Sequence, residues 1–83
     1  MDSFEAFERL KQSCVEDGLL KPAFGAGNLR ITKKGQDFVN GAAIADPEVG
    51  EALEEAVRSP WRERRDALVS LLLFARERLG GHV

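Results

Sequence analysis

The sequence predicts a mainly helical α+β domain in which one helix comes before a β-hairpin and three helices come after it. Apolar residues recur at spacings of three and four along several stretches, as in helices that bury one face. A glycine-rich segment separates two short apolar runs, which is typical of a hairpin. The expected elements are a helix at 3–16, a hairpin at 19–31, and helices at 33–40, 47–58 and 60–79.

Length and composition limit the kind of protein this is. A chain of 83 residues that is 43% hydrophobic and 31% charged is typical of one small soluble domain. We expect a single domain over 1–83, with a helix-and-hairpin half at 4–41 and a C-terminal helical pair at 46–79. Cys14 is the only cysteine, which excludes an intrachain disulfide and favours a reducing, cytoplasmic setting.

The first helix has a start signal, an apolar face and a stop signal. Asp2 followed by Glu5 fits a capping box, in which the two side chains satisfy free amide groups of the first turn. Gly18 can end the helix because glycine adopts the left-handed conformation without strain. The apolar residues share one face, and they are Phe4, Phe7, Leu10 and Cys14.

Cap and stop residues also bound the other three helices. Thr32 can cap the second helix, and Gly41 is expected to end it. Asp46 and Pro47 suit the cap and the first position of the third helix. The last helix has Ser59 as its expected cap, Pro60 at its first position, and Gly80 and Gly81 beyond its end.

The last helix carries an unusually wide apolar surface. Only Ser70 interrupts the apolar run at 67–75, so apolar side chains cover well over half of the helix circumference. One neighbouring helix cannot cover that surface. We therefore expect this helix to be central, or to meet a second chain through Leu71 and Phe74. The run has about nine apolar residues against the roughly 20 of a membrane-spanning helix, so no membrane span is expected.

Part of the chain resembles a known family. After the first helix come Gly18-Leu19-Leu20, a glycine-rich turn, and the run from Leu29 to Gly35. This order resembles the second half of a winged-helix domain, with the hairpin as its wing, over residues 4–41. The T-x-x-G-x-x-F box of small winged-helix-like bacterial and phage proteins is matched by Thr32, Gly35 and Phe38. The resemblance implies that the first helix corresponds to a recognition helix, without a counterpart of the two helices that usually come before it.

No combination of residues in the sequence predicts catalysis. His82 is the only histidine and lies next to the last residue, and Cys14 lies on an apolar face. The segment Gly25-Ala26-Gly27 lacks the Gly-Lys-Ser/Thr of a phosphate-binding loop. The glutamates at 48–55 are expected to be a solvated helix face rather than metal ligands. We expect a non-enzyme, with no catalytic residue, cofactor or metal site.

Nucleic-acid contact is an open alternative that the charges do not favour. The net charge is −2, with a basic stretch around the hairpin and an acidic one after it. Glutamates on the first helix would be repelled by phosphates. The basic side chains that can contact phosphate, or can simply be solvated, are Lys21, Arg30, Lys33 and Lys34.

Protein contact is the function class that we expect. Trp61 beside Arg62, Arg64 and Arg65 combines residue types that are enriched at interface hot spots, although Trp61 can equally close the core. The acidic third helix can dock on a basic surface, including one that normally holds nucleic acid. The candidate interface residues are Trp61, Arg62, Arg65, Leu71, Phe74, Glu51, Glu54 and Glu55.

We therefore expect a small intracellular binding protein that associates with itself or with a host protein. The resemblance to phage and bacterial proteins adds the expectation of an inhibitor or regulator, carried by a phage or mobile element, that acts on a host machine handling nucleic acid. The alternative is a dimeric winged-helix regulator that binds DNA.

Overall fold

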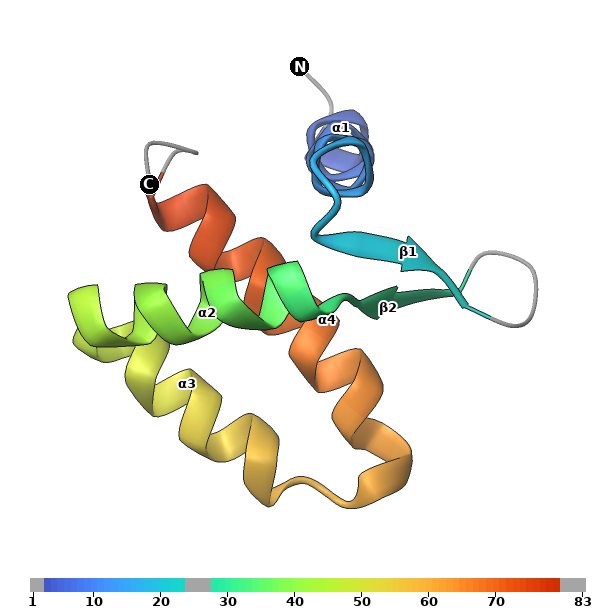
Figure 1. Cartoon of the computed structure of the whole chain (residues 1–83). Helices are drawn as coiled ribbons and strands as arrows, with labels where there is room; N and C mark the ends of the chain where they lie inside the picture. Colours follow the sequence, from blue (N-terminus) through green and yellow to red (C-terminus); the bar gives the residue numbers. More distant parts are fainter. Residues whose placement is uncertain (1–2, 24–27, 80–83) are drawn as a thin grey trace.

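The computed structural model describes residues 3–23 and 28–79. Within these ranges the chain forms four helices and one two-stranded antiparallel sheet, in the order that the sequence predicts (Figure 1). The expected α+β, mainly helical fold is confirmed. The elements are α1 (Ser3–Glu16), β1 (Leu20–Pro22), β2 (Leu29–Ile31), α2 (Lys33–Ala45), α3 (Pro47–Arg58) and α4 (Trp61–Leu79).

Strands β1 and β2 form the short hairpin. Leu20 pairs with Ile31, Lys21 with Arg30, and Pro22 with Leu29. Side chains alternate between the two faces of a strand, so the buried Leu20 and the exposed Lys21 point to opposite sides. The hairpin turn, with the segment Gly25-Ala26-Gly27, lies outside the described residues.

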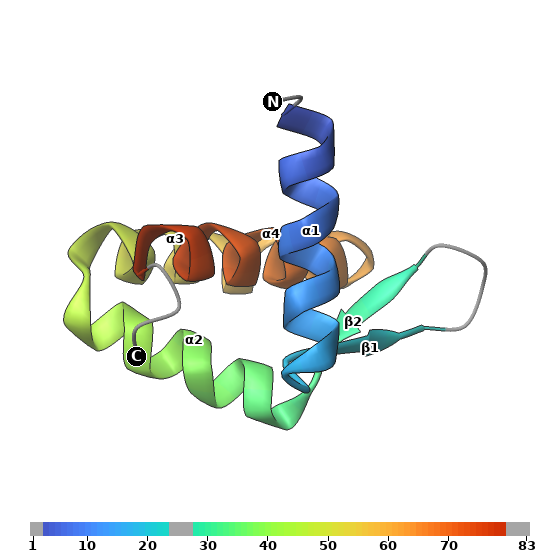
Figure 2. The same cartoon turned by 90° about the horizontal axis from the view of Figure 1, so that it is seen from above.

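The C-terminal end of α1 is fixed by Gly18, as predicted. Gly18 has a φ of 79°, and the amide of Leu19 donates to the carbonyl oxygen of Cys14 at 2.9 Å, which closes the helix end. The apolar face of α1 runs from the core into solvent. Cys14 is fully buried, whereas Phe7 is 48% exposed, because the N-terminal half of α1 extends beyond the other elements (Figure 2). Asp2, the expected cap, lies outside the described residues.

Helix α2 begins as predicted and ends later than predicted. The Thr32 hydroxyl accepts a hydrogen bond from the amide of Gly35 at 3.0 Å, which is the expected cap. Gly41 does not end the helix, and that prediction is wrong: α2 continues to Ala45. The physical reason is packing, since the next residue, Ala42, is fully buried in the core and holds another turn in the helical conformation.

Asp46 is the joint between α2 and α3. Its amide donates to the carbonyl oxygen of Ala42 at 2.8 Å, and its carboxylate accepts from the amide of Glu48 at 3.0 Å, as expected of the cap of α3.

Ser59 does not cap α4, and that prediction is wrong. Its hydroxyl donates backward to the carbonyl oxygen of Glu55 at 3.2 Å, while Pro60 accepts the first helical hydrogen bond of α4.

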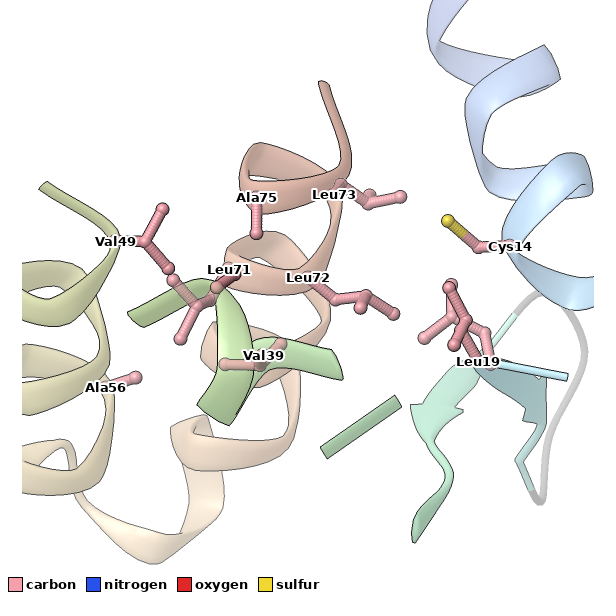
Figure 3. Packing of buried hydrophobic residues seen from close by; sticks show 11 residues of the cluster. Cys14, Leu19, Val39, Val49, Ala56, Leu71, Leu72, Leu73 and Ala75 are labelled. Atoms are coloured by element: carbon pink, nitrogen blue, oxygen red, sulfur yellow. The ribbon is translucent and has the colours of Figure 1, made fainter. Parts of the chain in front are cut away.

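Helix α4 is the centre of the fold, as one of the two expectations for it stated. It packs against α1, α2, α3 and β2. Figure 3 shows Leu71 on the side of Val49, with Leu72 and Leu73 on the side of Cys14. Leu71 and Leu73 are only 4% and 5% exposed, so most of the wide apolar surface is covered within one chain, whereas Phe74 is 37% exposed. The expectation that Leu71 meets a second chain is therefore wrong.

Three ion pairs, made by two arginines, hold the C-terminal end of α4. Arg76 pairs with Asp17, just beyond the end of α1. Arg78 donates from Nε to Asp46 Oδ2 at 2.7 Å, and its guanidinium lies 3.1 Å from the carboxylate of Glu48.

None of the helices in the described ranges combines the length and the apolar character that a membrane crossing requires.

We expect the ion pair of the Asp46 carboxylate to make the protein less stable in acid. The hydrogen bond from Arg78 lowers the pKa of Asp46 below its usual value, and the amide of Glu48 acts in the same direction. An unfolded aspartate ionises near pH 3.9, so the unfolded chain binds more protons as the pH falls below about 4. This contribution to stability is therefore present above about pH 4 and is lost as the pH falls through the lower native pKa. Urea unfolding at pH 2–6 should show that Asp46→Asn is less stable than the wild type at pH 6, and that the difference shrinks in acid. A difference in stability that does not depend on pH would contradict the lowered pKa of Asp46.

Candidate interaction surfaces

Two of the hollows beside α4 hold most of the predicted interface residues, and each is lined by a different face of this helix. Residues three and four apart share a helix face. Trp61, Arg64, Arg65 and Leu68 recur at this spacing and line a hollow beside the hairpin. On another face Phe74 lines a hollow beside α3. The sequence-predicted interface residues are therefore divided between two surfaces of the molecule.

The first surface, here called the acidic groove, lies between α3 and Phe74 of α4. It is a hollow of about 620 Å³ lined by Glu48, Glu51, Ala52, Glu54, Glu55, Arg58 and Phe74. Phe74 is 37% exposed, and the guanidinium of Arg78 lies 5.5 Å from the centre of its ring. The structure thus brings together four of the eight predicted interface residues, which are Glu51, Glu54, Glu55 and Phe74.

Charge in the acidic groove is only partly compensated. Glu48 pairs with Arg78. In the described part of the chain, the other three carboxylates of the groove form no ion pair: Glu51, Glu54 and Glu55. All three side chains are exposed. The groove therefore presents an excess of carboxylates over the single arginine of its lining, Arg58, around a partly exposed aromatic ring. Leu71 contributes only to the floor of the adjoining hollow between α3 and α4.

The second surface, here called the basic hollow, lies between the hairpin and the N-terminal half of α4. Its volume is about 520 Å³, and it is lined by Ala23, Arg30, Ile31, Trp61, Arg64, Arg65 and Leu68. Trp61 is 76% exposed, so it does not close the core. Arg62 lies next to the hollow, with its guanidinium 5.7 Å from the centre of the Trp61 ring.

The arginines of the basic hollow have weak partners. Arg64 donates to the carbonyl oxygen of Ser59 at 3.2 Å, which leaves its charge uncompensated. Arg65 lies 3.9 Å from the carboxylate of Asp66, and both side chains are largely exposed. An exposed pair at this distance contributes little. The hollow therefore carries a local positive charge in a protein whose net charge is −2.

The four residues considered for nucleic-acid contact do not form one cluster. Lys21 and Arg30 lie directly opposite each other on the hairpin. Lys33 pairs with Asp37 within α2 at 3.3 Å, and Lys34 lies in the first turn of α2 beside Gly18. Of the four, only Arg30 lines the basic hollow.

Arg64 was noted beside Trp61 in the sequence but was left out of the candidate interface residues, although it lines this hollow. Its spacing of three from Trp61 places both residues on one face of α4, and that signal was present in the sequence. No sequence signal pairs Arg30 with Arg65, because their proximity depends on how β2 packs against α4.

Reactive groups are few in the described part of the chain. Burial raises the pKa of the Cys14 thiol, so this cysteine is a poor nucleophile at neutral pH. Across 3–23 and 28–79, no three side chains of His, Cys, Asp or Glu are placed to hold a metal ion. His82 lies outside the described residues.

Comparison of the chain with protein-family models, with curated proteins and with solved structures finds no match.

Proposed function

We propose that this protein is a non-enzymatic binding protein that docks its acidic groove on a basic surface of a partner protein. The observation that carries the proposal is the grouping of Glu51, Glu54 and Glu55 around the exposed edge of Phe74. Interfaces commonly surround an aromatic anchor with charged residues at the rim.

Electrostatics gives the groove both speed and selectivity. Uncompensated carboxylates attract a basic partner over several ångströms and repel acidic ones, which raises the association rate and suppresses wrong complexes. Phe74 then supplies apolar area whose burial stabilises the complex. Arg78 is held by Asp46 and Glu48, so it keeps its place beside the ring when the partner arrives.

The partner that best fits this groove is a protein with a cationic surface of the kind that holds nucleic acid. Carboxylates on a helix can occupy such a surface and block it. The protein would then act as an inhibitor or regulator of a nucleic-acid-handling machine, in keeping with the resemblance of residues 4–41 to small phage and bacterial proteins.

Charge reversal in the groove should abolish partner binding. We expect the triple variant Glu51→Lys/Glu54→Lys/Glu55→Lys to bind its partner more than about tenfold more weakly, because attraction becomes repulsion. Tagged wild type and variant would be compared for capture from a lysate of the source organism, followed by titration of the purified partner. Phe74→Ala should also weaken binding, through lost apolar contact.

A matched control keeps the change in net charge and moves it elsewhere. Reversing three glutamates of α1 alters the net charge equally but leaves the groove intact, and the variant is Glu5→Lys/Glu8→Lys/Glu16→Lys. It should retain binding, and circular dichroism should show both triple variants folded, since the altered side chains are exposed. A monomeric wild type that retains no stoichiometric partner, or equal losses for both triple variants, would refute the proposal.

A further inference from the structure

The basic hollow has a lining of one charge sign. Three arginines belong to its lining, Arg30, Arg64 and Arg65, and no acidic residue belongs to it in the described part of the chain. The acidic residues of the same helix lie elsewhere. Glu63 is two residues from Trp61, which places it about 200° around the helix. Asp66 lines a different hollow, beside α1.

The hairpin adds a second cationic feature, which shares Arg30 with the hollow. Lys21 and Arg30 are direct cross-strand partners, so their side chains project from the same face, and both are exposed. Like charges in directly opposite positions destabilise a sheet, and strands of three residues have little stability to spare. An anionic ligand at this face would relieve the repulsion.

Trp61 adds a feature that charge alone does not require. Its ring is 76% exposed at the mouth of the hollow, beside Arg62. Unpaired nucleobases stack on such aromatic rings and on the planar guanidinium of arginine, whatever their sequence. Carboxylates of an acidic peptide have no aromatic ring to stack, and the bases of a duplex are already stacked on each other.

We propose that the basic hollow binds single-stranded nucleic acid, with phosphates on Arg30, Arg64 and Arg65 and one base stacked on Trp61. This is a separate activity on a separate surface from the acidic groove. An experiment can therefore refute nucleic-acid binding by the basic hollow without refuting protein binding by the acidic groove, and the reverse.

The test is a titration of the full chain with a fluorescein-labelled 12-nucleotide oligo(dT), followed by anisotropy. Trp61 is the only tryptophan, so its emission reports on this site alone, and stacking should quench it. We expect a Kd between about 1 and 100 µM at low salt. The logarithm of the binding constant should fall with the logarithm of the salt concentration, with a slope of about −2 to −3 for three or four phosphates.

Variants separate the charge from the stacking. Arg30→Glu/Arg65→Glu should remove detectable binding. Trp61→Ala should weaken binding by about 5- to 100-fold, and Trp61→Phe should restore most of it. Lys33→Glu/Lys34→Glu makes the same change in net charge outside the hollow and should cost far less. All of these side chains are exposed, and circular dichroism would verify the fold of each variant.

Several results would overturn the proposal. One is no binding of oligo(dT) at 100 µM protein, and another is equal affinity of Trp61→Ala and wild type. Tighter binding of a 12-base-pair duplex would indicate duplex recognition instead. Quenching of Trp61 by a 12-residue glutamate peptide at equal affinity would assign the hollow to an acidic protein. A change in Trp61 emission with protein concentration alone would assign it to a second copy of the chain.

Discussion

Replacing Gly35 with alanine is expected to be among the most damaging single-methyl changes in this protein. A Cβ at this position would lie 2.2 Å from the carbonyl oxygen of Leu19 and 2.7 Å from Cγ1 of Ile31. The carbonyl cannot easily move aside, because it accepts the hydrogen bond from the amide of Thr32 at 3.0 Å. The Ile31 side chain is constrained as well, since Ile31 pairs with Leu20 in the sheet.

The size of the effect follows from this overlap with backbone. Forcing extra volume into a packed site costs about 1–3 kcal/mol and more where the backbone must shift. We expect a loss of about 3 kcal/mol or more from a total stability of about 5–15 kcal/mol. At about 4–8 °C per kcal/mol for a domain of this size, thermal unfolding followed by circular dichroism should show a midpoint lower by more than about 10 °C.

Gly41→Ala is the matched control, since it adds the same methyl group to the same helix. Apart from its chain neighbours and the nearby backbone of its own helix, a Cβ at Gly41 would have no atom within 4 Å, and Gly41 does not have a positive φ. Alanine in a helix interior is favoured over glycine by about 0.5–1 kcal/mol, so this variant should be slightly more stable than the wild type. If Gly35→Ala unfolds at the wild-type temperature, the close approach of α2 to Leu19 is wrong.

The two hydrogen bonds of Thr32 show which parts of the fold the sequence could predict and which it could not. Thr32 was predicted as a cap from its type and position, and its hydroxyl does accept from the amide of Gly35. The same hydroxyl donates to the carbonyl oxygen of Gly18 at 2.6 Å and so ties α2 to the end of α1. That second bond depends on a tertiary approach across 14 residues, for which the local sequence has no signal.

The glycines that were expected to end α1 and α2 behaved differently for a related reason. Gly18 ends α1 with a positive φ, whereas Gly41 continues α2. Glycine only permits the left-handed conformation; whether the chain adopts it depends on what the next residues gain by packing. After Gly41, burial of Ala42 favours another turn.

The candidate sites were predictable only where their residues lie on one element. The glutamates of α3 share a face by helical spacing, and the sequence grouped them correctly. Arg30 was grouped with Lys33 and Lys34 because they are neighbours in the chain. Packing of β2 against α4 places Arg30 with Arg65 instead.

The sequence also could not predict how many other elements pack around α4. A helical wheel gives the width of an apolar surface, and that width predicted either a central helix or a contact with a second chain. It does not give the number of neighbours, and here four elements surround α4. The buried state of Leu71 and Leu73 follows from that arrangement rather than from their own neighbours in the chain.

The central position of α4 makes Leu72→Ala the second change with a large expected effect. Leu72 is fully buried, and Figure 3 places it between Val39 of α2 and Leu19 before β1. Removing its outer carbons takes away apolar contact and leaves a cavity that surrounding helices fill only in part. Such changes cost about 2–5 kcal/mol. The unfolding midpoint should therefore fall by about 10–30 °C.

Ile44→Ala is the control for Leu72→Ala, because it deletes as many carbons from a helical residue that is 89% exposed. Its effect should stay within about 0.5 kcal/mol, since those carbons are already in water. Urea unfolding of both variants gives the comparison directly, and the slope with denaturant should match the wild type if only the native state has changed. Similar losses for the two variants would mean that Leu72 is not enclosed by α2 and the hairpin. A lone domain with a closed core would then no longer explain the apolar run of α4, and a second chain would have to cover it.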